Sequence, residues 1–301
     1  MNMKVKYLKA FSATKKTLAL VVAFIIIFGV GMPQMVHAQN RKVKNPALVN
    51  LSLNTTYTGY DITGDGKRDT IRISSTSLDD YLEKGLTVKI NGKEALCNKE
   101  WAYYKEYVSL RLCTLKNGKV YLYIYNPADN AVAEYCGLFQ YDKGKLKCAL
   151  DMKKFNGLDK FADQVSGAVK SVSGNRITVE MIHGSYEIGG IHTCFDYKYS
   201  KGKLIRTTDI IKDFDCWFIS SNGGKLTARN DIKVYAKTNC KTKAFILKAG
   251  EQIKVKSIYC KSGKMLLKVQ RLSDGKNGYI KCIKHYPKDG HAPFTEVEYA
   301  G

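Results

Sequence analysis

The run Lys119-Val-Tyr-Leu-Tyr-Ile-Tyr125 alternates aliphatic side chains with tyrosine, and Arg176-Ile-Thr-Val-Glu-Met-Ile182 alternates apolar with polar side chains. A period of two residues is typical of a β-strand, because successive side chains point to opposite faces of a sheet. Other short runs rich in Val, Ile, Tyr and Thr follow along the chain, separated by turns such as Asn91-Gly92 and Lys143-Gly144. Strands spaced about ten residues apart with such turns predict an all-β protein.

The two runs belong to an internal repeat with a period near 58 residues. The segment Leu115–Leu146 contains the first run, Cys136 and a Lys-Gly-Lys-Leu turn, and the segment Val172–Leu204 contains the second run, Cys194 and the same turn. This period predicts units of about four strands, blade-like or sandwich-like, with room for about three between residues 47 and 218. A closed propeller of four or more blades is therefore not expected.

The first 38 residues have the composition of a secretory signal peptide. Five lysines and no acid precede an apolar run, Leu18–Gly31, and Val36-His37-Ala38 supplies the small residues of a cleavage site. We therefore predict cleavage after Ala38 and a secreted protein associated with the cell wall. The apolar run is short for a membrane-spanning helix of ~20 residues, so an uncleaved anchor is the less favoured alternative. The long, lysine-rich start resembles Gram-positive signal peptides.

Lysine dominates the charge of the chain. There are 49 Lys and Arg against 27 Asp and Glu, a formal charge of +22, with 45% hydrophobic and 25% charged residues. This composition is globular and excludes a disordered or collagen-like protein, and the charge favours anionic partners. Residues 223–284 hold 16 Lys and Arg but three acids, a net charge of +13, whereas residues 39–222 carry +6. The excess charge belongs to the C-terminal part.

The chain divides by composition near Ser220-Ser-Asn-Gly-Gly224, a stretch typical of a linker, after which lysine becomes more frequent. We expect six parts in order: a signal peptide at 1–38, a disordered N-terminus at 39–46, a β domain with the repeat at 47–218, a linker at 219–224, a small β domain at 225–284 and a tail at 285–301.

The predicted domain at 225–284 carries three spaced landmarks. They are a Val-Tyr-Ala-Lys strand with Tyr235 and Lys237, a Leu-Lys-x-Gly-x-x-Ile-x-Val turn around Gly250, and a closing Gly-x-x-Gly-Tyr-Ile segment with Tyr279. Over about 60 residues this resembles the bacterial SH3 domain. The resemblance implies a small SH3-like β-barrel that binds peptidoglycan or wall peptides, with Tyr235, Tyr279 and Lys237 as ligand-binding residues. Tyr279 stands where many members carry tryptophan.

The segment Asp61–Asp69 has oxygen-bearing side chains at relative positions 1, 3, 5 and 9, and glycine at position 6. This spacing suits Ca²⁺, which takes six to eight oxygen ligands. The loop resembles those of secreted calcium-binding repeats of the dockerin and integrin-propeller kinds. The predicted ligands of a structural calcium ion are the side chains of Asp61, Thr63, Asp65 and Asp69 and the backbone carbonyl of Lys67.

The loop differs from an EF-hand, because Arg72 and not glutamate stands at its twelfth position. Ile71-Arg-Ile-Ser, which follows the loop, has the pattern of a strand. The sequence therefore predicts a strand–loop–strand site. The alternative is an acidic, glycine-rich hairpin turn without a metal.

Nine cysteines occur after residue 38, an odd number without a Cys-x-x-Cys pair, so at least one thiol is free or pairs between chains. Many lie in strand-like runs, where a small buried side chain is the plain interpretation. His192-Thr-Cys194 is the only close pairing of the two residue types, and a strand would put both on one face. Catalysis, or zinc binding with His183, is an alternative there. Cys136, its equivalent in the repeat, has no histidine nearby, which favours packing.

These features predict an exported, non-catalytic cell-envelope protein. Its basic C-terminal domain would bind cell-wall polymers, either peptidoglycan or teichoic-acid-like polyanions, or wall peptides. Export argues against nucleic acid as the main ligand, and no segment after the signal peptide is apolar enough to cross a membrane. The alternative is a peptidoglycan-directed wall hydrolase whose N-terminal domain is catalytic.

Overall fold

The computed structural model describes residues 46–127, 133–154, 161, 165–261, 263–285 and 287–298. The predicted signal peptide and residues 39–45 of the predicted disordered N-terminus lie outside these residues, as do parts of the predicted tail. The described residues all belong to one compact unit, Asn40–Gly301. Among them, no helix is both long enough and apolar enough to cross a bilayer.

The predicted all-β fold is confirmed. Within the described part of the chain every strand pairing is antiparallel, and the helix there, α2 (Trp217–Ser221), has five residues. Antiparallel pairing follows from short turns, because a two-residue connection can only return the chain beside the strand it has just left.

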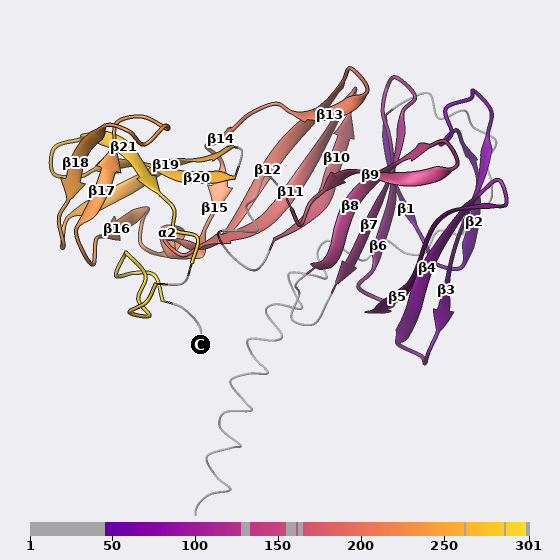
Figure 1. Cartoon of the computed structure of the whole chain (residues 1–301), viewed down its shortest axis with the longest axis horizontal. Coiled ribbons are helices and arrows are strands. Elements are labelled where there is room, and N and C mark those ends of the chain that lie inside the picture. Colours follow the sequence, from indigo (N-terminus) through magenta and orange to yellow (C-terminus); the bar gives the residue numbers. More distant parts are fainter. Residues whose placement is uncertain are drawn as a thin grey trace, which may run out of the picture. The chain divides into compact units, whose positions relative to one another are not determined.

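Three antiparallel meanders of four strands follow one another along the chain (Figure 1). The first contains β2 (Thr55–Tyr60), β3 (Asp69–Ser77), β4 (Leu82–Ile90) and β5 (Lys93–Tyr104). The second contains β6 (Ser109–Thr114), β7 (Val120–Pro127), β8 (Ala133–Asp142) and β9 (Lys145–Asp151), with β1 (Ala47–Leu51) beside β6. The third contains β10 (Ser166–Ser173), β11 (Arg176–Ser185), β12 (Gly189–Ser200) and β13 (Lys203–Arg206), with β15 (Phe214–Asp215) beside β12. Three four-stranded units are the number that the repeat predicts.

The same turn joins the third and fourth strands of each meander. Asn91-Gly92, Lys143-Gly144 and Lys201-Gly202 have φ pairs of 51° and 77°, 48° and 88°, and 49° and 85°. Positive φ at both central residues defines a type I′ turn, whose twist matches that of the flanking strands. Shifting β6–β9 by the 58-residue period brings each strand onto its counterpart in β10–β13.

The C-terminal sheet has the strand order β14-β19-β20-β21-β17-β18, and β16 also pairs with β19. Its strand β14 comes from the predicted N-terminal domain, and α2 overlaps the predicted linker. The bounds are β14 (Ile210–Ile211), β16 (Lys225–Thr227), β17 (Ile232–Tyr235), β18 (Lys243–Leu247), β19 (Gln252–Lys261), β20 (Lys264–Arg271) and β21 (Asn277–Lys281).

Strand β7, the first of the alternating runs, contributes to two separate cores. Its aliphatic residues Leu122 and Ile124 pack in a cluster with the first meander. Its tyrosines Tyr121 and Tyr123 pack in a second cluster, which continues through the third meander into the C-terminal sheet. The Tyr123 hydroxyl donates to the Gly167 carbonyl of β10 at 2.7 Å, which satisfies its buried oxygen. Alternation here separates two buried faces and not a buried face from solvent.

Candidate functional site

The C-terminal sheet brings two of the predicted ligand-binding residues together. Tyr235, at the end of β17, and Tyr279, in β21, are direct partners in the antiparallel register, and both are half-buried. Side chains of directly opposed residues lie on the same face of a sheet. Lys237 lies outside this pair, exposed in the loop after β17, where its carbonyl accepts the Cys240 N–H at 3.0 Å.

Lysines extend this tyrosine pair on both sides. Lys268 of β20 is the register partner of Tyr279, and Lys243 of β18 is the partner of Tyr235. Lys233 places Nζ 5.3 Å from the centre of the Tyr235 ring, a distance at which a cation is attracted to the ring face. We call the row Lys268, Tyr279, Tyr235 and Lys243 the cross-strand row. The lysines of this row were missed in the sequence, since no local pattern shows which strands pair.

The acids of residues 223–284 are already paired with other cations. Asp231 pairs with Lys248 at 2.7 Å, and both Glu251 and Asp274 pair with Arg271, at 3.4 and 2.5 Å. Hydrogen bonds from these cations lower the pKa of Asp231 and of Asp274 below the usual range.

Many lysines of the same region have no such partner. Among the described residues, none of the following forms an ion pair: Lys233, Lys237, Lys243, Lys268 and Lys281. Their charge is not neutralised within the described fold, so it is available to an external anion.

A groove of about 410 Å³ adjoins the cross-strand row and is lined by Lys233, Tyr235 and Lys281 on one side. Glu187 also lines it and is 1% exposed. The Glu187 carboxylate accepts the Ser185 hydroxyl and the Ile283 N–H, each at 2.6 Å, and burial raises its pKa. This carboxylate therefore joins the third meander to the segment that follows β21.

The predicted calcium loop connects β2 and β3, two paired strands, as the sequence indicates. Oδ1 of Asp61 accepts the N–H groups of Gly64 at 2.7 Å and Asp65 at 3.1 Å, and Oδ2 accepts that of Gly66 at 2.8 Å. Gly66 has φ of 84°, a conformation that costs glycine little because it has no Cβ. The loop therefore curls around the Asp61 carboxylate.

The other predicted calcium ligands lie within this turn or directly after it in the chain. Asp69, at the start of β3, is 2% exposed and accepts the Thr63 N–H at 2.9 Å and an Asn91 amide N–H at 2.6 Å. Asp65 accepts the Lys67 N–H at 2.8 Å. Within the described part of the chain, no group of three or more His, Cys, Asp or Glu side chains is arranged to hold a metal ion. The predicted donor atoms at this loop are all oxygens, which Ca²⁺ prefers. Calcium binding there stays a prediction.

His192 and Cys194 are both exposed on one face of β12 and line an open groove of about 440 Å³. The Cys194 Sγ lies 3.6 Å from Lys170 Nζ, which also pairs with Glu180 at 3.7 Å. No hydrogen bond between described residues joins His192 to Cys194. His183 is 1% exposed and points into the core, away from the exposed face that carries the other two.

All nine cysteines are described, and none forms a disulfide with a described residue. Burial raises the pKa of Cys113, Cys136 and Cys260 to about 12. The interpretation as small buried side chains is confirmed for Cys113, Cys136, Cys216, Cys260 and Cys282.

Comparisons of the chain with protein-family models, curated proteins and solved structures find no match. Function is therefore inferred from the charge, the aromatic side chains and the cavities of the C-terminal sheet. These features combine half-buried tyrosines with lysines that form no ion pair with a described residue, a combination that can attract an anion.

Proposed function

We propose that this is an exported, non-catalytic cell-envelope protein that binds anionic wall polymers through its C-terminal sheet. The observation that carries the proposal is the cross-strand row, in which two register-paired tyrosines lie between lysines that form no ion pair with a described residue. The predicted signal peptide supports export. The resemblance of residues 225–284 to bacterial SH3 domains supports a wall ligand.

A polyanion fits this face for an electrostatic reason. Lys233, Lys243 and Lys268 lie on three strands of one sheet, so a polymer with repeated negative charges can contact several of them at once. The attraction between exposed charges weakens as salt shortens the Debye length from about 30 Å at 0.01 M to about 3 Å at 1 M. Tyr235 and Tyr279 are half-buried, so their rings add contact area at a small cost in side-chain entropy.

Sedimentation with purified Gram-positive cell walls tests the proposal, using the chain from residue 39 onward. We expect co-sedimentation at low salt that is lost at 1 M salt. A comparison of two wall preparations, one with teichoic acid and one without it, identifies which polymer is bound. If the protein stays in the supernatant at low salt with both wall preparations, the proposal is wrong.

A matched pair of double variants tests the cross-strand row itself. Lys243→Gln with Lys268→Gln removes two charges from the row, and Lys254→Gln with Lys256→Gln removes two from β19. We expect the first pair to weaken wall binding at least tenfold and the second no more than threefold. Equal losses of wall binding in the two double variants would contradict a role for the row and would attribute binding to net charge alone.

Zymography on peptidoglycan separates this proposal from the alternative of a wall hydrolase. A binding protein leaves the peptidoglycan intact, so no cleared band is expected. A cleared band that persists in the Cys194→Ser variant would place a catalytic function elsewhere in the protein. A band lost in that variant would assign the activity to the groove at His192 and Cys194.

The same proposal includes a structural calcium ion in the loop Asp61–Asp69. Its support is the sequence spacing, the strand–loop–strand arrangement and an oxygen donor set. An ion there would hold the connection between β2 and β3.

A further inference from the structure

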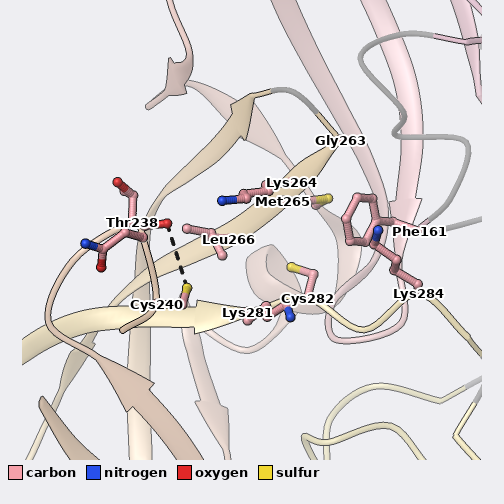
Figure 2. Close-up of a pocket in the computed structure, with 11 residues that line it drawn as sticks. Phe161, Thr238, Cys240, Gly263, Lys264, Met265, Leu266, Lys281, Cys282 and Lys284 are labelled. Atoms are coloured by element: carbon pink, nitrogen blue, oxygen red, sulfur yellow. Dashed lines mark hydrogen bonds between the residues drawn. The ribbon is translucent and has the colours of Figure 1, made fainter. Parts of the chain in front are cut away.

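A pocket of about 190 Å³ opens at one end of the C-terminal sheet (Figure 2). Its walls are the loop Thr238–Cys240 after β17, the first residues of β20, and Lys281, Cys282 and Lys284 at and after the end of β21. Phe161 lies at another side of it. Lys281 also lines the groove beside Tyr235, so the two cavities share a wall.

The interior of this pocket is apolar. Four side chains that line it, those of Phe161, Met265, Leu266 and Cys282, are each 1% exposed. For scale, an apolar protein cavity of about 150 Å³ holds a benzene molecule. The pocket therefore has room for an apolar group about the size of one small ring or a short alkyl chain.

Positive charge surrounds the pocket. Lys264, Lys281 and Lys284 line it, and none of them forms an ion pair with a described residue. Among the described lining residues there is no acid. Lys284 Nζ lies 5.7 Å from the centre of the Phe161 ring, so this cation is close to the apolar part of the pocket. An anion would gain from all three charges, whereas a cation would be repelled by them.

Three sulfur-containing side chains also line the pocket, and the surrounding charge indicates whether they could bind a metal ion. Cys240, Met265 and Cys282 could be ligands of a soft metal ion. The thiolate and not the thiol is the metal ligand, and burial raises the pKa of Cys282 well above its usual range. Three unpaired ammonium groups act against a metal cation as well. The sulfurs therefore serve as apolar, polarisable wall atoms.

One wall of the pocket is fixed in an uncommon conformation. Cys240 has φ of 54°, a left-handed backbone that residues other than glycine seldom adopt. Its N–H donates to the Lys237 carbonyl at 3.0 Å, and its thiol contacts the Thr238 carbonyl at 3.8 Å (Figure 2). Such a conformation persists only where its surroundings hold it, so these two contacts fix this wall of the pocket.

We infer that this pocket binds a carboxylate carried on a short apolar group. The apolar part would occupy the space between Phe161, Met265 and Leu266, and the carboxylate would meet Lys264, Lys281 and Lys284. Two sources have this chemistry: a free monocarboxylate, and the carboxyl-terminal residue of a peptide. The inference deepens the proposed function, and rests on it only where the ligand is the end of a wall peptide.

Paired ligands test the inference with the chain from residue 39 onward. Hexanoate and benzoate carry a charge opposite to that of the pocket and fit its size. Hexanamide and benzamide lack that charge, and acetate lacks most of the apolar part. By calorimetry we expect the two carboxylates to bind at least tenfold more tightly than their amides and than acetate. An acetylated dipeptide ending in leucine, compared with its amide, tests the peptide source. Equal binding of acids and amides would overturn the inference.

Cysteine labelling locates the binding. Cys240 lines the pocket and is half-buried, whereas Cys97 is exposed in β5. Hexanoate should slow the alkylation of Cys240 at least fivefold, measured by mass spectrometry, and leave that of Cys97 unchanged. If both rates stay unchanged while hexanoate binds, the ligand occupies another place and the inference is wrong.

Single lysine variants complete the test. Lys264→Gln should weaken the binding of hexanoate at least threefold and leave the binding of hexanamide unchanged. Lys254→Gln on β19 is the matched control. The experiments distinguish failure of this inference from failure of the proposed function. Wall binding without carboxylate binding contradicts the pocket alone, and carboxylate binding without wall binding contradicts the wall ligand alone.

Discussion

The backbone N–H of Asn117 donates to Oδ1 of Asn175 at 2.9 Å, and the two asparagines are 58 residues apart. This separation is the period of the sequence repeat. Lys116 N–H donates to the Gly174 carbonyl at 2.8 Å with the same offset, and Arg111 Nη1 donates to the Val169 carbonyl at 2.6 Å with the same offset again. Equivalent positions of the second and third meanders therefore contact each other directly, so the two units stack in register.

The Asn175 side chain should stabilise this stacking. Replacing it in Asn175→Ala leaves the Asn117 N–H without its partner, so we expect a loss of about 0.5–1.5 kcal/mol in the free energy of unfolding. For a protein of this size that is a fall of a few degrees in Tm, roughly 2–4 °C per kcal/mol. Urea unfolding measures it. Asn230→Ala, which removes an exposed asparagine without a hydrogen bond to a described residue, should change stability by less than about 0.5 kcal/mol.

His183 should make the fold sensitive to acid. It is buried, its Nε2 lies 3.3 Å from the Thr193 hydroxyl, and burial lowers its pKa to about 4 from an ordinary value near 6.5. The unfolded chain then binds a proton that the folded chain does not, so stability falls as pH drops from 6.5 to 4. The total loss is on the order of 3 kcal/mol.

Urea unfolding at intervals across this range measures the slope. In His183→Gln the slope between pH 6.5 and 4 should be flatter than in the unsubstituted protein. His291→Gln, which changes an exposed histidine, is the control and should keep the original slope. An equal slope in the His183 variant would show that this side chain is not held neutral.

Glu187 should act in the opposite direction. Burial raises its pKa, so the folded protein holds a proton that the unfolded chain has released. Its contribution to stability is complete below the ordinary glutamate pKa and is lost as pH rises through the raised value. Glu187→Gln keeps groups that can bond to Ser185 and Ile283 and removes the titration.

This variant should therefore gain stability relative to the unsubstituted protein as pH rises above about 4.3. Denaturation of the two proteins side by side from pH 4 to 8 measures the difference. Glu298→Gln, at an exposed position, should show no such trend. A constant difference across the range would mean that Glu187 does not titrate with folding.

Calcium binding at Asp61–Asp69 should appear as a rise in Tm. A ligand that binds only the folded state at 100 times its Kd adds about 2.7 kcal/mol. We expect calcium to raise Tm relative to chelator, and Asp65→Asn to abolish most of that rise. Asp79→Asn is the matched control, because Asp79 accepts the N–H groups of Tyr81 and Leu82 in another acidic turn. An unchanged Tm would favour the alternative of a turn without metal.

The sequence located part of the candidate site and missed the rest. The resemblance to bacterial SH3 domains implies Tyr235 and Tyr279 as ligand-binding residues, and the structure makes them register partners. Lys243 and Lys268, which extend the row, come from strands with no local sign that they lie beside those tyrosines. Lys237, the third ligand-binding residue that the resemblance implies, lies in the loop after β17 and outside the row. Pairing between strands far apart in sequence is set by packing, which a local pattern does not contain.

The alternating strands, the glycine-containing turns and the repeat can all be predicted from local sequence. These depend on interactions within a few residues: alternation along Lys119–Tyr125, and a glycine after Asn91, Lys143 or Lys201 that tolerates positive φ. Tertiary packing buries both faces of β7 and adds β14 to the C-terminal sheet. It also places Phe161 and Cys282 along one pocket. These features depend on which surfaces meet, because burial gains free energy from contacts between residues that the chain itself keeps far apart.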